Sequence, residues 1–168
     1  MADGKFVSIE SGRKKLKQAI DASTGATDSD KIIRTDSNGK IDQSFFPTGI
    51  GADTKIIEAS ENLDAGDFVN IFDDTGTTKV RKADASNDRP ANGFILVAAN
   101  SGNNATVYFE GENNGLSGLS GGTRYYLDTA GDITSTAKTA SGELHQYLGT
   151  ACSATSINVE MSESVIIE

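Results

Sequence analysis

The chain is poor in the residues on which several classes of protein depend. Its 168 residues include one cysteine, one histidine, two prolines and no tryptophan. A single cysteine excludes a disulfide-stabilised secreted domain and a cysteine-rich zinc module, and a single histidine excludes a metal site built from several histidines. No hydrophobic run in the sequence approaches the roughly 18 residues of a membrane-spanning helix. We therefore expect no membrane partner.

Positive charge is also scarce, and it is unevenly placed. The chain has 15 Lys and Arg against 24 Asp and Glu, a net charge of -9. Residues 1–40 carry eight basic and six acidic groups, whereas the remaining 128 residues carry seven basic and 18 acidic groups. An acidic chain binds nucleic acid poorly, so we expect no nucleic-acid partner. The asymmetry favours a basic arm that docks on an acidic partner and an acidic body that faces water; a chance cluster of charges on a solvated helix is the alternative.

Residues 1–53 are expected to form an N-terminal arm that starts with an extended segment. Lys5–Ile9 alternates weakly between polar and apolar residues, as a strand at a sheet edge does. Ser11 is a candidate N-cap for a short helix over about residues 11–22. An isolated helix of that length is marginal in water, so this segment needs a partner.

The end of the arm combines a turn signal with two aromatic residues. Asn38-Gly39 separates short β-like runs and predicts a tight turn, since both residues tolerate positive φ. Phe45 and Phe46 follow, immediately before Pro47. Two readings stay open for the pair: a plug in the chain's own core, or an anchor in a neighbouring subunit.

From residue 54 to residue 168 the sequence alternates between short strands and turns. Phe68–Phe72 and Thr77–Ala83 flank a turn-forming tetrad and predict a hairpin. Gly93–Ala99 is the most continuous apolar run and is expected to be a central strand that pairs with Ala105–Glu110. Strands spaced every 8–12 residues or so are typical of a sandwich or barrel. The expected fold is mainly β, with a small β-barrel or β-sandwich body and an extended N-terminal arm that contains a short helix.

Residues with chemical potential are present but do not form a recognisable catalytic pattern. Gly115–Gly122 lacks the Gly-Lys-Ser/Thr ending of a phosphate-binding loop. His145 and Cys152 are an odd number of residues apart, which places them on opposite faces of a regular strand, and Cys152 is expected to be a small buried residue. Glu110 and Glu112 precede a turn-rich stretch and are expected to be exposed loop carboxylates. We therefore expect no catalytic residue, no cofactor and no metal, and the chain is not expected to be an enzyme.

Several short motifs resemble a recurring pattern in structural proteins of tailed bacteriophages. They lie between residues 31 and 160 and are rich in leucine, glycine, tyrosine and turn residues. The stretches that carry the resemblance are Arg34–Pro47, Leu63–Val69, Gly93-Phe94, Thr106–Gly111, Gly118–Leu127, Ala130–Thr134 and Gln146–Ala151.

By this resemblance the chain is similar to the capsid decoration (cement) proteins, which lie outside the major capsid shell and stabilise the expanded head. The resemblance implies a non-enzymatic virion protein on the outer surface of the capsid, made in the host cytoplasm. It also implies the major capsid protein as partner, a homotrimer, and an N-terminal extension that lies on the capsid. The alternative is a phage fibre, spike or tail-associated protein, with or without receptor or glycan binding.

The residues expected to bind the capsid or a neighbouring subunit combine the apolar and basic side chains of the arm. These are Phe6, Val7, Ile9, Arg13, Lys14, Lys15, Leu16, Lys17, Ile20, Phe45 and Phe46. Strand pairing together with apolar burial is the expected mode of binding.

Overall fold

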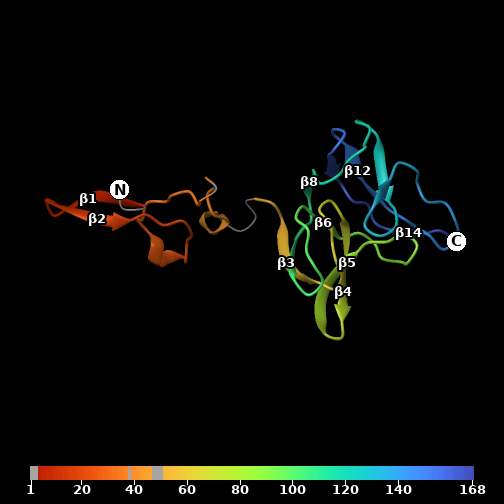
Figure 1. Cartoon of the computed structure of the whole chain (residues 1–168), viewed down its shortest axis with the longest axis horizontal. Helices are drawn as coiled ribbons and strands as arrows, with labels where there is room; N and C mark the ends of the chain where they lie inside the picture. The colour runs from red at the N-terminus through yellow and green to blue at the C-terminus, as the bar shows by residue number, and fades with distance from the viewer. Residues whose placement is uncertain (1–3, 38, 47–50) are drawn as a thin grey trace. The chain divides into compact units, whose positions relative to one another are not determined.

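The computed structural model describes residues 4–37, 39–46 and 51–168. The chain divides into two compact units, Met1–Gly51 (unit 1) and Ala52–Glu168 (unit 2) (Figure 1). Most of the regular structure is β-strand, which confirms the expectation of a mainly β chain. No helix among the described residues is long and apolar enough to cross a membrane.

Unit 1 begins with a β-hairpin of strands β1 (Lys5–Glu10) and β2 (Arg13–Gln18). The strands pair antiparallel, from Lys5 opposite Gln18 to Glu10 opposite Arg13. Ser11 and Gly12 connect them with φ angles of 48° and 73°. Two consecutive residues with positive φ are what a tight two-residue hairpin turn of the type I′ class requires.

The helix expected over residues 11–22 is therefore wrong, because these residues form the turn and the second strand of the hairpin. Arg13–Gln18 consists of straight-chain residues that favour helix only weakly, by fractions of about 1 kcal/mol per residue. Pairing with β1 satisfies the backbone along the whole strand and overrides that preference. The extended conformation expected for Lys5–Ile9 is confirmed.

The rest of unit 1 is irregular. Two 3-10 turns, η1 (Ala26–Asp28) and η2 (Gln43–Phe45), are its other regular elements among the described residues. Ile20 forms an isolated parallel bridge with Ile33, so the β-like run expected around residues 31–35 contributes one bridge and no strand. A turn closes where Asp36 N–H donates to the Lys40 carbonyl (2.8 Å); Asn38, the expected turn residue, lies outside the described residues.

The first half of unit 2 is a ring of five hydrogen-bonded strands. Their order is β3-β5-β4-β6-β7, and β7 pairs with β3 to close the ring. The ring strands are β3 (Thr54–Ala59), β4 (Phe68–Asp74), β5 (Thr77–Lys82), β6 (Gly93–Ile95) and β7 (Asn104–Tyr108). The β4–β5 hairpin confirms the turn predicted at residues 73–76. The pairing of β6 with β7 is also as expected, but β6 ends at Ile95 and Val97 is 74% exposed, so the central strand is shorter than the apolar run.

The second half of unit 2 adds a five-stranded antiparallel sheet and a two-stranded one. The larger sheet has the order β10-β9-β12-β13-β8, and β11 pairs with β14. These strands are β8 (Gly111–Asn113), β9 (Arg124–Leu127), β10 (Ile133–Thr134), β11 (Leu144–His145), β12 (Tyr147–Ala151), β13 (Ile157–Val159) and β14 (Val165–Ile166).

Two apolar clusters hold unit 2 together. One cluster is formed by side chains of the ring, among them Ile57, Val80 and Val107. The other joins ring residues such as Phe68 and Phe94 to buried side chains of the larger sheet. The rings of Phe68 and Phe94 are 6.0 Å apart, a favourable distance for aromatic packing. The ring and the sheet therefore share a core.

The backbone of Gly66 touches that of Gly115 inside unit 2. A Cβ on Gly115 would lie 2.6 Å from the Gly66 nitrogen, and the Asn113 amide donates to the Gly66 carbonyl over 2.8 Å. A methyl group at Gly115 would force these two segments apart. Gly121, in the same loop, has open space around its Cβ position.

We predict that Gly115→Ala lowers the free energy of unfolding of unit 2 by about 1–3 kcal/mol, the usual cost of overpacking. Gly121→Ala is the matched control and is expected to change it by less than about 0.5 kcal/mol. Chemical denaturation monitored by tyrosine fluorescence measures both. Equal stability of the two variants would contradict the close contact.

Candidate functional site

The predicted binding residues of the hairpin lie on its two faces. Val7 lies opposite Leu16 and Ile9 lies opposite Lys14, and side chains alternate between faces along a strand. Val7, Ile9 and Leu16 therefore share one face, with exposed fractions of 62%, 71% and 61%. We call these three residues the apolar strip. Three large apolar side chains side by side and open to solvent are characteristic of a surface that binds a partner.

Lysines border the apolar strip on its own face. Lys14 lies opposite Ile9, and Lys5 lies two residues before Val7 on the same strand face. Both lysines are exposed. A partner that covers the strip would therefore bring apolar and acidic groups to this face.

The other face of the hairpin carries the remaining predicted hairpin residues. Phe6 lies opposite Lys17 and is half-buried, whereas Arg13 lies opposite Glu10. Glu10 forms ion pairs with Lys17 and with Lys15, whose Nζ is 2.9 Å from the carboxylate. Such exposed pairs contribute little to stability, so they orient side chains more than they hold the hairpin together.

A shallow cavity of about 550 Å³ adjoins this second face. Phe6, Lys17 and Ile20 line it together with residues 29–31. Ile20 is half-buried there. The structure thus brings Phe6, Lys17 and Ile20 together on one side of the hairpin, and the apolar strip lies on the other.

Phe45 and Phe46 do not enter a core. Phe45 is half-buried and Phe46 is 43% exposed, and neither belongs to the two apolar clusters of unit 2. The reading of the pair as a plug in the chain's own core is wrong for Phe46. The reading as an anchor in a neighbouring subunit stays a prediction.

Unit 1 buries very little apolar surface in the part of the chain that the structure describes. Among its described residues, Ala19 is the one buried apolar side chain. Seven of the eleven large apolar side chains that are exposed in the described chain belong to unit 1: Val7, Ile9, Leu16, Ile32, Ile33, Ile41 and Phe46. Because so few apolar side chains are buried, the conformation of unit 1 depends on local hydrogen bonds.

Polar contacts organise the loop that follows the hairpin. Asp28 accepts hydrogen bonds from the Thr24 N–H (2.5 Å) and from the Lys31 ammonium (2.5 Å). The hydrogen bonds from Lys31 and Thr24 lower the pKa of Asp28 to about 2. Arg34 donates to Asp21 across this loop (2.7 Å). The carboxylates of the loop thus neutralise Lys31 and Arg34 of the same loop, whereas the hairpin keeps a surplus of positive charge.

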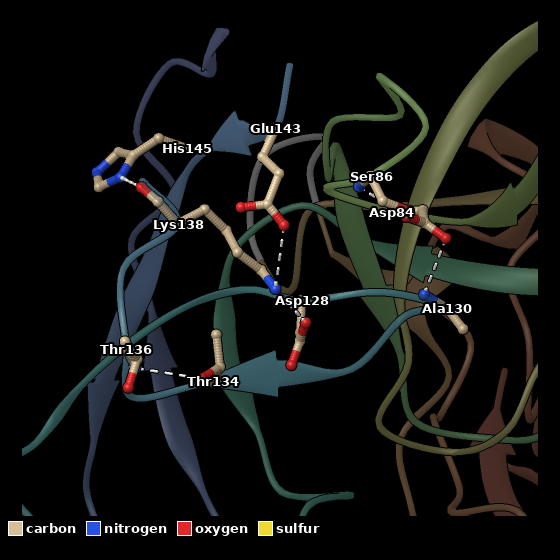
Figure 2. A network of polar contacts seen from close by, with 9 residues as sticks. All are labelled: Asp84, Ser86, Asp128, Ala130, Thr134, Thr136, Lys138, Glu143 and His145. Atoms are coloured by element: carbon tan, nitrogen blue, oxygen red, sulfur yellow. Dashed lines mark hydrogen bonds and ion pairs between the residues drawn. The ribbon is translucent and has the colours of Figure 1, made fainter. Parts of the chain in front are cut away.

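Figure 2 shows a network of polar contacts in unit 2, centred on Lys138. Its Nζ donates to Asp128 (2.7 Å) and lies 3.8 Å from Glu143, and the hydrogen bond to Asp128 raises the pKa of Lys138. His145 Nδ1 is 3.2 Å from the Lys138 carbonyl. Asp84 accepts hydrogen bonds from Ser86 and from the Ala130 N–H. These contacts tie loops to strands.

Of the residues that the sequence offered for chemistry, Glu110 and Glu112 are exposed and His145 is half-buried. Cys152 is exposed rather than buried as expected, because it follows β12 in a turn at the surface. The ring of His145 packs 5.2 Å from that of Tyr126. Among the described residues no group of three or more His, Cys, Asp and Glu side chains is placed to hold a metal ion.

Sequence reasoning missed a cleft in unit 2. It treated residues 115–122 as a loop that fails as a phosphate site, but the structure places part of this loop beside Asp67 and Lys82. These residues come from three separate segments of the chain, so no local spacing indicates that they meet.

Comparisons with known proteins give little further guidance. No protein-family model matches the chain, and no curated protein matches it. Among solved structures the chain is similar to "head fiber gp8.5 N base in bacteriophage phi29", with a TM-score of 0.47 and 11% sequence identity over 70% of this chain and 95% of that chain. A likeness at that level supports no inference on function.

We predict that Val7→Ala combined with Leu16→Ala leaves the thermal unfolding of unit 2 unchanged, because both side chains are exposed and belong to unit 1. Val107→Ala is the control, since Val107 is fully buried, and it is expected to cost roughly 2–3 kcal/mol. Calorimetry of the full chain measures both effects. A loss of stability in the double variant similar to that of Val107→Ala would mean that the strip is part of the core.

Proposed function

We propose that this chain is a non-enzymatic structural protein of a phage virion, which binds the outer surface of the capsid through the β1–β2 hairpin and stabilises the shell. One observation carries the proposal: unit 1 exposes the apolar strip and buries a single apolar side chain among its described residues. The sequence resemblance to capsid decoration proteins suggests the capsid as the surface that covers the strip.

Burial of the apolar strip supplies a sizeable driving force for docking. Fully burying a Val, Leu or Ile side chain is worth about 1.5–3 kcal/mol. The three side chains of the strip are each roughly two-thirds exposed. Covering them would therefore contribute roughly 3–6 kcal/mol per hairpin before the costs of association.

The charges of the two units favour different surroundings. Residues 5–18 of the hairpin hold five basic side chains and one acidic one, Glu10, a net charge of +4. Residues 52–168 hold seven basic and 17 acidic side chains, a net charge of -10. The hairpin is attracted to an acidic surface, while the bodies of neighbouring copies repel one another and stay in water.

The hairpin also offers backbone groups for binding. A two-stranded ribbon has two outer edges, and each edge presents N–H and C=O groups that a strand of a partner can pair with. Strand addition at an edge and burial of the strip fit the same extended partner. A protein that binds the assembled shell and not the free subunits stabilises that shell by mass action.

We predict that Val7→Asp combined with Leu16→Asp weakens binding to heads at least about 100-fold, because docking would bury two uncompensated charges. Ile56→Asp is the matched control, since Ile56 is 66% exposed on β3 of unit 2, and it is expected to bind as wild type. Co-sedimentation of purified protein with empty heads of the phage that encodes the chain measures the affinity.

Full decoration of heads by the Val7→Asp and Leu16→Asp double variant would contradict docking by the hairpin. If wild-type protein does not bind heads and binds tails or fibres instead, the chain is a fibre or tail-associated protein and the proposed capsid location is wrong.

The proposal includes a homotrimer, which the resemblance implies. Three tethered hairpins would convert weak single contacts into strong overall binding. Light scattering of the purified chain is expected to give three times the 17.6 kDa mass of one copy. A mass of 17.6 kDa at micromolar concentration would contradict the trimer and would leave single hairpins to supply the whole affinity.

A further inference from the structure

Unit 2 contains a cleft of about 680 Å³ that the proposed function does not use. It is bordered by the segment 64–67 before β4, the loop 115–119 and the turn 130–135. Small-molecule sites usually measure about 300–1,000 Å³ and combine apolar walls with a few polar groups. The volume of this cleft lies within that range.

Part of the lining of the cleft is charged. Lys82 Nζ lies 3.1 Å from the Asp64 carboxylate and 3.0 Å from that of Asp67. The side chain of Asp67 is 9% exposed, and burial raises its pKa although Lys82 and the Asp64 N–H donate to it. Asp132 is exposed and lines the same cleft. The lining therefore offers three carboxylates and one ammonium group.

Other lining residues are apolar. Leu116, Leu119 and Ile133 line the cleft and are half-buried. Tyr125 also lines it and is buried, and its hydroxyl accepts a hydrogen bond from the Ser120 N–H (3.0 Å). A ligand in the cleft therefore meets both hydrogen-bonding groups and apolar C–H groups.

Backbone contacts fix the shape of the cleft before any ligand arrives. The direct contact of Gly66 with Gly115 and the hydrogen bond from Asn113 to the Gly66 carbonyl hold two of its borders together. On the third border, a Cβ on Gly131 would lie 3.0 Å from the Asp67 carboxyl carbon. A preformed site loses little conformational entropy on binding.

We propose that this cleft binds a neutral carbohydrate. A sugar ring has hydroxyl groups along its edge and C–H groups on its faces, and the mixed lining offers polar and apolar partners for both. Carboxylates accept hydrogen bonds from sugar hydroxyls and Lys82 donates to them, and such charge-assisted bonds are the stronger ones.

Charge selects against anionic sugars. An anionic sugar would face Asp64, Asp67 and Asp132 with one lysine to offset them, and like charges in contact are costly. We therefore expect neutral hexoses or N-acetylhexosamines to bind better than anionic sugars.

The test is saturation-transfer NMR on the full-length chain with glucose, galactose and N-acetylglucosamine, and with sialic acid as an anionic probe. We expect transfer to at least one neutral sugar and none to sialic acid. Asp132→Asn is expected to weaken binding of that sugar about tenfold, and Ser117→Trp, which places a large side chain in the cleft, is expected to abolish it. Glu110→Gln is the matched control: it removes one exposed negative charge outside the cleft and should bind as wild type.

Three results would overturn the proposal. They are the absence of transfer to any neutral sugar at 10 mM, a preference for sialic acid, and unchanged binding in both Asp132→Asn and Ser117→Trp. A thermal melt of each variant verifies that unit 2 is folded. Because head binding is measured with hairpin variants and sugar binding with cleft variants, either property can fail without the other.

Discussion

A two-stranded ribbon is a single layer with no second layer against which to bury its apolar side chains, and this constraint governs unit 1. An isolated hairpin is at best marginally stable in water. Here Val7, Ile9 and Leu16 stay about two-thirds exposed, and the rest of the described unit buries one alanine. In the proposed function a partner outside the chain covers this surface. The contrast between a basic hairpin and an acidic unit 2 fits that proposal, since a docking segment and a solvated body need opposite properties.

Unit 2 pairs its ring strands and buries an apolar core within its own residues. The ring of β3 to β7 leaves no unpaired edge among its five strands, and a shared apolar cluster joins it to the second sheet. Closed strand pairing protects against edge-to-edge aggregation. The same packing leaves a cleft where loops from three parts of the chain meet. In the proposed function unit 2 is the carrier and the hairpin supplies the attachment.

The sequence was a good guide where local chemistry decides the structure. The β4–β5 hairpin follows from β-branched runs around the tetrad at residues 73–76. The β1–β2 hairpin was missed because Arg13–Gln18 reads as helix, although Ser11-Gly12 is a turn signal that would have indicated it. The sequence predicts Val7, Ile9 and Leu16 as binding residues. That they share one face of a hairpin follows only from the strand register. The cleft could not be predicted, because Asp67, Leu116 and Asp132 approach one another only through tertiary packing.

The central claim is that the hairpin is covered by a partner when the protein performs its function, and hydrogen exchange tests it most directly. Amide exchange is measured by mass spectrometry on the free protein and on the protein bound to heads. Because a lone ribbon opens easily, amides of residues 5–18 should exchange rapidly in the free protein and become strongly protected on heads. Amides of the ring strands should be protected equally in both. Unchanged exchange of residues 5–18 on decorated heads would contradict the account.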